Sequence, residues 1–196
     1  MLTLIILAAG KSTRMQGINK LLTKINGVTM IRGVTQAALK SKVDEVIVVL
    51  GFEAEKVKET IADLSCRIVI NKDYEKGQSS SLITGMRVIN KSTRAILVLP
   101  GDLARIETPS INLVVQSYMK EGGHIVSAAY NGRLGHPILL SRELFDEIML
   151  ITEESSGLKT VVTKHRNEMR LVETNTENVL TDVDYPDDLR KLADKC

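Results

Sequence analysis

A short turn near the start of the chain carries the residue types that bind phosphate. An apolar run over residues 4–8 leads into Gly10, and cationic side chains follow at Arg14 and Lys20. Small residues let the backbone approach a ligand closely, lined-up backbone N–H groups bind anions, and the two cations add positive charge. We therefore expect this turn to hold the phosphates of a nucleotide. The residues expected to contact the nucleotide here are Leu7, Ala8, Ala9, Gly10, Arg14 and Lys20.

Two other phosphate-binding patterns do not fit the same turn. A dinucleotide-binding fingerprint requires G-x-G-x-x-G, whereas only Gly10 and Gly17 are present. A Walker loop requires an upstream glycine at the position where Ile5 stands. A polar connection between a strand and a helix, with incidental charges, is the alternative interpretation.

Acidic residues that follow predicted strands are candidates for a metal site beside those phosphates. Asp102 comes after the apolar run 94–99 and the pair Pro100-Gly101, so we expect it at the carboxyl end of a strand. Mg²⁺ prefers carboxylate and phosphate oxygens as ligands. A turn residue or a helix cap is the alternative for Asp102. Near the C-terminus, Asp182 and Asp184 are further candidates, and the alternative there is the N-cap of a helix over residues 187–193.

The hydrophobic pattern predicts a fold that brings these residues to one edge. Apolar runs typical of buried strands alternate with amphipathic stretches typical of helices. The expected strands are 4–8, 45–50, 67–70, 94–99 and 125–130, and the expected helices are 29–40, 54–64, 80–89 and 110–121. Apolar strands separated by helices indicate a three-layer α/β/α, Rossmann-like fold with a mostly parallel sheet. Ligands bind such sheets outside the carboxyl ends of the strands.

The alternation loosens after Tyr130. Residues 138–140, 142–150, 158–165 and 170–172 indicate a mixture of strands and helices. No repeat or low-complexity linker separates this part from the rest, so we predict one domain over residues 1–196.

Composition argues against several classes of protein. The chain of 196 residues has 26 basic and 24 acidic side chains, and a net charge of +2 gives no signal for nucleic acid or a membrane surface. Aromatic residues make up 3%, too few for a platform that stacks single-stranded bases. The apolar N-terminal run is shorter than a membrane span and has no basic segment before it. We therefore expect a cytoplasmic protein.

The cysteines and histidines give no disulfide or zinc signature in the sequence. Cys66 and Cys196 lie far apart, as expected of free thiols in a reducing compartment. His124 and His165 do not lie at metal-ligand spacing with either cysteine, so no zinc site is indicated.

Five motifs occur in an order that points to one family. They are Leu7-Ala8-Ala9-Gly10-Lys11-Ser12-Thr13-Arg14-Met15 with Lys20 close behind, Asn71 with Gly77-Gln78-Ser79-Ser80-Ser81-Leu82, Leu97-Val98-Leu99-Pro100-Gly101-Asp102, Gly135-His136-Pro137, and Asp182-Val183-Asp184-Tyr185-Pro186-Asp187-Asp188-Leu189. Together they resemble the MobA-like NTP transferases, the nucleotidyltransferases of molybdenum cofactor biosynthesis. The G-H-P motif is similar to that of the branch using molybdopterin and CTP, so the chain looks closest to a molybdenum cofactor cytidylyltransferase.

The resemblance implies a fold, a reaction and partners. The fold would be that of the nucleotide-diphospho-sugar transferases (GT-A-like), with a nucleotide half at residues 1–123 and an acceptor half at residues 124–196. The reaction would move CMP from CTP to molybdopterin with release of pyrophosphate and with Mg²⁺ as cofactor. A molybdoenzyme or its chaperone is a candidate partner, and no nucleic acid or membrane partner is expected.

The resemblance also implies roles for particular residues. Asn71, Gly77, Ser81, Leu82 and Asp102 would join the turn in binding the nucleotide. Asp102 and Asp184 would hold the metal, with Asp182 as the alternative second ligand. Gly135, His136 and Pro137 would bind the acceptor. Arg14, Lys20 and Asp102 would carry catalysis by offsetting charge while an acceptor phosphate oxygen attacks the α-phosphorus.

The chain departs from the family pattern at three places. Gln16 replaces a glycine, Leu103-Ala104 replaces Met-Pro, and the family's G-D-x-G-A-R segment appears as Ser155-Ser156-Gly157-Leu158-Lys159. A lysine does not copy the bidentate fork of an arginine, so the acceptor is less firmly specified than the nucleotide. The alternatives are a guanylyltransferase, a nucleotidyltransferase for a sugar or polyol phosphate, and a nucleotide-binding delivery protein without turnover. A nicotinamide oxidoreductase would need the missing glycine fingerprint.

Overall fold

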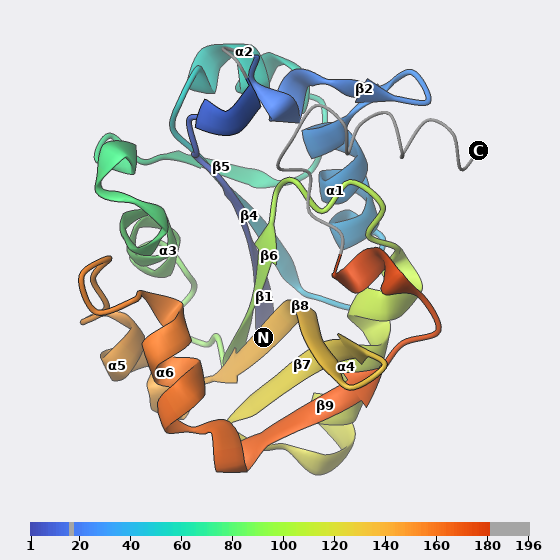
Figure 1. Cartoon of the computed structure of the whole chain (residues 1–196), viewed down its shortest axis with the longest axis vertical. Helices are drawn as coiled ribbons and strands as arrows, with labels where there is room; N and C mark the ends of the chain where they lie inside the picture. Colours follow the sequence, from blue (N-terminus) through green and yellow to red (C-terminus); the bar gives the residue numbers. More distant parts are fainter. Residues whose placement is uncertain (16–17, 181–196) are drawn as a thin grey trace.

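A seven-stranded, mostly parallel sheet forms the centre of the computed structural model, which describes residues 1–15 and 18–180. The strands in spatial order are β5 (Arg67–Ile70), β4 (Glu45–Leu50), β1 (Leu2–Ala8), β6 (Ala95–Pro100), β8 (Arg133–Ser141), β7 (Ile125–Tyr130) and β9 (Met169–Glu173). β8 pairs antiparallel with both of its neighbours, and every other pair in this sheet is parallel. The carboxyl ends of β5, β4, β1 and β6 therefore meet at one edge (Figure 1).

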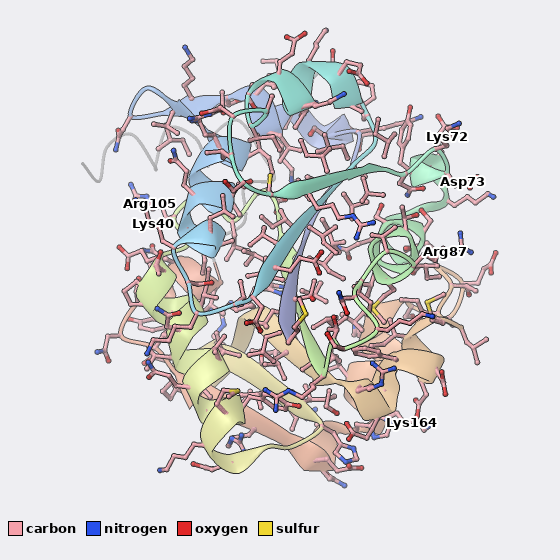
Figure 2. The ribbon with its side chains drawn as sticks, turned by 180° about the vertical axis from the view of Figure 1, so that it is seen from behind. Lys40, Lys72, Asp73, Arg87, Arg105 and Lys164 are labelled. Atoms are coloured by element: carbon pink, nitrogen blue, oxygen red, sulfur yellow. The ribbon has the colours of Figure 1, made fainter. Side chains whose placement is uncertain are left out.

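Helices cover both faces of the sheet, which confirms the three-layer prediction. Helices α1 (Met30–Leu39), α2 (Ala54–Glu59) and α4 (Thr108–Glu121) pack on one face, and α3 (Gln78–Met86), α5 (Phe145–Ile148) and α6 (Leu158–Lys164) pack on the other. The alternation of side chains along a strand explains the two cores: Leu4 and Ile6 belong to one, and Ile5 to the other. Charged side chains such as Lys72, Arg87 and Lys164 lie at the periphery (Figure 2).

The boundaries of most predicted elements agree with the structure. β4, β5 and β7 match their predicted ranges residue for residue, because each run rich in β-branched and apolar residues stops at a turn-forming residue, Gly51, Asn71 or Asn131. The predicted helix over 54–64 is wrong at its end, since α2 stops at Glu59 and turns follow. The predicted helix over 80–89 is shifted, because α3 begins at Gln78 and ends at Met86.

Two tight hairpins were not predicted. Asn26-Gly27 joins β2 (Lys24–Ile25) to β3 (Val28–Thr29), and Asn131-Gly132 joins β7 to β8. All four turn residues have positive φ, between 51° and 80°. This is the backbone that Asn-Gly favours in two-residue hairpins, so the pair was a usable signal. The second hairpin reverses the chain and makes β8 antiparallel.

Short 3-10 turns complete the described part: η1 (Thr13–Met15), η2 (Lys20–Leu22), η3 (Tyr74–Lys76), η4 (Arg142–Leu144), η5 (Arg166–Glu168) and η6 (Glu177–Val179). Within residues 1–15 and 18–180, no helix combines the length and apolar character that a membrane crossing requires. Cys66 is a free thiol whose pKa is raised by burial, and Cys196 falls outside the described residues.

Candidate active site

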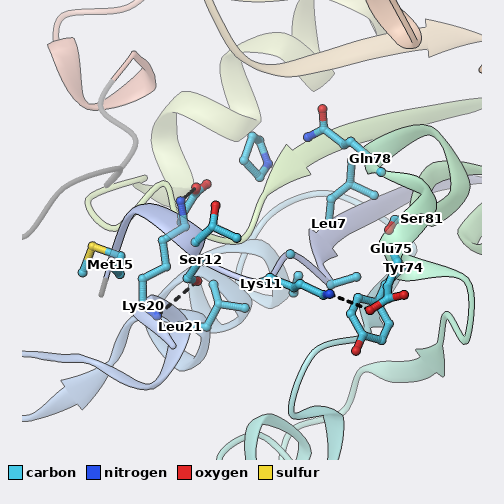
Figure 3. Close-up of a pocket in the computed structure, with 17 residues that line it drawn as sticks. Leu7, Lys11, Ser12, Met15, Lys20, Leu21, Tyr74, Glu75, Gln78 and Ser81 are labelled. Carbon is cyan, nitrogen blue, oxygen red and sulfur yellow. Dashed lines mark hydrogen bonds and ion pairs between the residues drawn. The ribbon is translucent and has the colours of Figure 1, made fainter. Parts of the chain in front are cut away.

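A cavity of about 440 Å³ opens at the carboxyl ends of β1 and β6. Its lining includes eight residues predicted for the nucleotide site: Leu7, Ala8, Ala9, Gly10, Lys20, Gly77, Ser81 and Asp102. Figure 3 shows Lys20 and Ser12 on one side of the cavity and Tyr74 and Glu75 on the other. The phosphate turn and the predicted metal carboxylate therefore share one cavity.

Close packing of three strand ends explains the small residues in the turn. The Cβ that a side chain would add at Gly51 would lie 2.6 Å from the Cβ of Tyr74 and 2.8 Å from that of Ala9. A Cβ at Gly101 would lie 3.1 Å from the Cβ of Ala8. By contrast, a Cβ at Gly10 would meet no protein atom within 4 Å. Packing thus requires glycine at position 51 and leaves little room at Gly101, whereas Gly10 leaves space for a ligand at the cavity wall.

An ion pair joins the turn to the end of β6. Nζ of Lys20 lies 2.5 Å from Oδ2 of Asp102, and the two side chains are only 15% and 17% exposed. A hydrogen bond from the backbone N–H of Lys20 to Oγ of Ser12, at 3.3 Å, helps to hold Lys20 in this position. The side chain of Asn19 caps the same turn by accepting from the N–H of Leu21 at 3.2 Å.

The segment that begins α3 forms the opposite wall and is held by a carboxylate from far along the chain. Oε1 of Glu153 accepts a hydrogen bond from the N–H of Ser79 at 2.6 Å. Gly77 has φ +91°, and a Cβ there would lie 2.3 Å from Cγ of Glu153. An anion at a helix N-terminus is favourable because the first N–H groups have no partner within the helix. The helix begins two residues before the predicted start at Ser80, so Ser80 lies in its first turn, where its Oγ donates to the carbonyl of Gly77 at 2.8 Å.

Two predicted nucleotide contacts lie outside the lining of this cavity. Nδ2 of Asn71 donates to Oγ of Ser80 at 2.8 Å and to Oγ of Ser81 at 3.1 Å, so Asn71 ties the end of β5 to α3. Leu82 is buried in the core beneath α3 and lines a neighbouring cavity. Both residues support the wall of the first cavity, which we name the nucleotide cavity for its predicted ligand, from behind.

A second cavity, of about 240 Å³, adjoins the first. Leu7 and Gln78 line both cavities, so the two meet at the end of β1 and the start of α3. His136 and Lys159 line the second cavity. Burial lowers the pKa of His136, against smaller raising effects of a hydrogen bond to the backbone of Val98 and of the Asp102 charge. A neutral imidazole near Asp102 is therefore the expected form of His136 at neutral pH.

The other two residues of the G-H-P motif have packing roles. A Cβ at Gly135 would lie 2.7 Å from the carbonyl oxygen of Val179, so the close approach of η6 requires glycine. Its carbonyl accepts from Oγ of Ser127 at 2.8 Å. Pro137 is buried next to it in β8. Of the three residues, His136 faces a cavity.

Lys11, Tyr74 and Glu75 are among the cavity-lining residues that were not predicted for the site. Nζ of Lys11 lies 2.5 Å from Oε1 of Glu75 and 5.8 Å from the ring centre of Tyr74, across the cavity mouth. Tyr74 also packs against Phe52, with the ring centres 6.5 Å apart. Tyr74 and Glu75 follow shortly after the end of β5, so the rule for ligand sites at strand ends was the available signal.

Some predicted site residues lie outside the described part of the chain. Asp182 and Asp184 fall within residues 181–196, and Gln16 within 16–17. The backbone of Arg14 belongs to η1, and its side chain is not described.

A mostly parallel sheet covered on both faces, with a small-residue turn and an acidic residue after adjacent strands, is typical of nucleotide-binding α/β proteins. The match to a family model identifies which family of α/β proteins this is. The chain belongs to the family described as the MobA-like NTP transferase domain, which it matches over residues 4–169. It is therefore a member of a nucleotidyltransferase family.

Two curated relatives differ in how much of them the chain covers. GlmU, a bifunctional protein of Staphylococcus saprophyticus subsp. saprophyticus, is 28% identical over 156 residues, which are 78% of this chain and 34% of that protein. The matched part is thus about a third of GlmU. The nicotine blue oxidoreductase of Paenarthrobacter nicotinovorans is 25% identical over 195 residues, 96% of this chain and 94% of that protein.

Solved structures share the fold along the whole chain. The crystal structure of Rv0371c from Mycobacterium tuberculosis H37Rv has a TM-score of 0.87 at 25% identity, with 98% of this chain and 97% of that chain covered. A complex of Rv0371c with manganese has a TM-score of 0.83 at 23% identity, with 100% and 99% covered.

Proposed function

We propose that this chain is a Mg²⁺-dependent nucleotidyltransferase that moves CMP from CTP to molybdopterin and releases pyrophosphate. One observation carries the proposal: the turn after β1 and the carboxylate after β6 meet across a single cavity, where Lys20 lies 2.5 Å from Asp102. The volume of about 440 Å³ falls within the range of small-molecule sites. The resemblance of the G-H-P motif to the CTP-using branch supports the choice of base and acceptor.

The environment of Asp102 fits a divalent cation. Its carboxylate is already paired with a positive charge, the ammonium of Lys20, and both side chains are largely buried. Asp102 would hold the ion together with Asp184, or with Asp182, both outside the described residues. When bound, Mg²⁺ would supply positive charge to the phosphates and polarise the bond that breaks. The manganese complex of Rv0371c is consistent with a divalent ion in this fold.

The chain's own residues would bind and orient the triphosphate. The backbone of the turn and Gly10 would contact the phosphates, and Lys20 and Arg14 would offset their charge. The acceptor would occupy the second cavity, beside His136 and Lys159. Because Leu7 and Gln78 line both cavities, the two substrates would meet there.

The chemistry needs no general base from the protein. An acceptor phosphate oxygen forms the new bond to the α-phosphorus, and the bond from that phosphorus to the pyrophosphate oxygen breaks in line. A phosphate monoester is already ionised at neutral pH, so no proton has to be removed. The neutral imidazole of His136 would hydrogen-bond the acceptor without adding charge.

A panel of four NTPs, each offered with molybdopterin and Mg²⁺ in a pyrophosphate-release assay, tests the proposal. We expect release with CTP to exceed release with the other three. A preference for GTP would favour the guanylyltransferase, and release with sugar or polyol phosphates alone would favour that acceptor class. Tight NTP binding without pyrophosphate release from any acceptor would favour a delivery protein.

One observation favours a second candidate, an oxidoreductase. The relative named nicotine blue oxidoreductase aligns over 94% of its own length, whereas the GlmU match covers 34% of that protein. The absence of a G-x-G-x-x-G sequence after β1 argues against dinucleotide binding in the usual manner. Oxidation of NADH or NADPH by the purified chain in the presence of a heteroaromatic acceptor, without pyrophosphate release from any NTP, would favour this candidate.

A further inference from the structure

A separate cluster of metal-ligating side chains lies at the edge of the sheet opposite the nucleotide cavity. His124 directly precedes β7, His165 directly follows α6, and Glu168 directly precedes β9. β7 and β9 are parallel neighbours, so their amino ends lie side by side, at the lower edge in Figure 1. One ligand atom from each of the three residues lies within 4.8 Å of the others. We propose that His124, His165 and Glu168 bind a divalent transition-metal ion of the Zn²⁺ type.

The separations of the ligand atoms fit a single small cation. Oε2 of Glu168 lies 2.9 Å from Nδ1 of His124, and its Oε1 lies 3.3 Å from Nδ1 of His165. Ligand atoms about 2.0–2.1 Å from a tetrahedral Zn²⁺ stand about 3.3 Å apart, so both Glu168 contacts are near that spacing and all three ligand atoms lie within 4.8 Å of one another. Two imidazoles with one carboxylate suit Zn²⁺, Co²⁺ or Ni²⁺ better than Mg²⁺ or Ca²⁺.

A neighbouring carboxylate orients one of the two histidines. Oε1 of Glu147 lies 3.1 Å from Nε2 of His165, and its Oε2 lies 3.0 Å from Nζ of Lys164, labelled near the same edge in Figure 2. Histidines that bind metals commonly donate the other ring N–H to a carboxylate, which fixes the tautomer. With Nε2 directed to Glu147, His165 presents the lone pair of Nδ1 toward Glu168 and the proposed ion.

The position of His124 favours coordination over a simple hydrogen bond. Its Nδ1 is buried and close to Glu168, yet the approach is not aligned as a hydrogen bond, and this atom has no other hydrogen-bond partner in the described part of the chain. Leaving a buried polar atom unsatisfied costs free energy, which coordination would recover. The side chains of His124 and Glu168 are 44% and 50% exposed, so water can complete the coordination.

An ion bound here would hold the end of a helix that lines the second cavity. His165 directly follows α6, and Leu158, Lys159 and Val162 of that helix line the second cavity. Because the ligands come together in the folded chain, the ion would stabilise it by mass action. The inference is independent of the proposed reaction, since none of the three ligands lines the nucleotide cavity.

Titration of the metal-free full chain with Co²⁺ at pH 7.5 tests the site directly. Tetrahedral Co²⁺ absorbs visible light strongly, whereas an ion bound mainly by oxygens at Asp102 absorbs weakly, so the spectrum separates the two sites. We expect one equivalent bound with micromolar affinity or better and displaced by Zn²⁺. His124→Ala, His165→Ala and Glu168→Gln should abolish the tetrahedral signal, and Glu147→Gln should weaken binding by about 10–100-fold.

Controls keep this result distinct from a general loss of structure. Glu55→Gln, an exposed carboxylate on α2, should bind Co²⁺ as the unaltered chain does. Urea unfolding in EDTA identifies any variant that fails to fold. The unaltered chain at pH 5.5 should also lose the signal, because protons compete for the imidazoles. The proposal is overturned by a missing tetrahedral spectrum at pH 7.5, by millimolar affinity only, or by folded ligand variants that bind Co²⁺ normally.

Discussion

The ammonium of Lys20 and the carboxylate of Asp102 form an ion pair that closes one side of the nucleotide cavity. A cation opposite a carboxylate at a proposed metal position implies an exchange: as Mg²⁺ and CTP bind, Lys20 would leave Asp102 for a phosphate. Charge would thus be balanced in both states, which limits the cost of burying Asp102 before substrate arrives.

Replacing Lys20 with methionine tests this exchange. Lys20→Met should lower kcat/KM for CTP by about 10²–10³-fold, because a preorganised charge is lost from the transition state. In the absence of nucleotide, it should tighten Mn²⁺ binding, because no ammonium competes for Asp102. Lys72→Met, on the exposed periphery, is the matched control and should leave both measurements unchanged. Unchanged turnover in Lys20→Met would refute the charge role.

The carboxylate of Glu153 should stabilise the wall of the cavity. Glu153→Gln should lower the free energy of unfolding by about 1 kcal/mol, because the α3 N-terminus loses a charged partner. It should also weaken CTP binding, since Gly77, Gln78 and Ser81 line the cavity. Glu154→Gln, at the adjacent exposed position, is the control for urea unfolding and CTP titration. Equal effects of the two substitutions would contradict the capping role.

Close packing at the strand ends should make Gly51 intolerant of a side chain. Gly51→Ala should cost about 1–3 kcal/mol of stability, because its methyl group would collide with Ala9 and Tyr74. Gly33→Ala is the control: in α1 the added methyl meets no atom within 4 Å, so it should stabilise by up to about 1 kcal/mol. Thermal unfolding of both variants measures the contrast. Destabilisation by both to the same extent would argue against a local collision.

A bidentate ion pair should give Asp63 an unusually acidic carboxyl group. Nη1 and Nη2 of Arg32 donate to its two oxygens at 2.6 and 2.7 Å, and the pKa of Asp63 falls from 3.8 to about 2. Because the pKa is depressed in the folded state, the pair's contribution to stability is present above pH 3.8 and lost as the pH falls toward about 2. In an NMR titration, Arg32→Gln should return the midpoint toward 3.8. A midpoint unaffected by the substitution would show that another group lowers this pKa.

The sequence predicted those parts of the fold whose signals are local. The runs over β4, β5 and β7 stop at turn-forming residues, Gly51, Asn71 and Asn131, so the structure has these strands at the predicted residues. The end of α2 was not, because Ile61 and Leu64 continue the helical spacing even though they pack from turns. The Asn-Gly pairs were local signals too, and attention to them would have predicted both hairpins.

The site was predictable where it follows from topology. The turn after β1 and Asp102 after β6 follow neighbouring parallel strands, whose carboxyl ends lie at one edge of the sheet. The role of Glu153 had no such signal. Its partner Ser79 is distant in the sequence, and nothing in the residues around Glu153 distinguishes it from other glutamates in polar loops. The cluster of His124 and His165 was missed for the same reason. The two histidines are far apart in the sequence, and they come together only because β7 and β9 pair in the sheet.

Calorimetric titration of CTP into the unaltered chain and into Asp102→Asn, each with and without Mg²⁺, tests the central claim most directly. If Asp102 holds the ion that accompanies the triphosphate, Mg²⁺ should tighten CTP binding to the unaltered chain by at least about tenfold, or about 1.4 kcal/mol. It should leave the affinity of Asp102→Asn nearly unchanged. The same Mg²⁺ enhancement in both proteins would contradict the account.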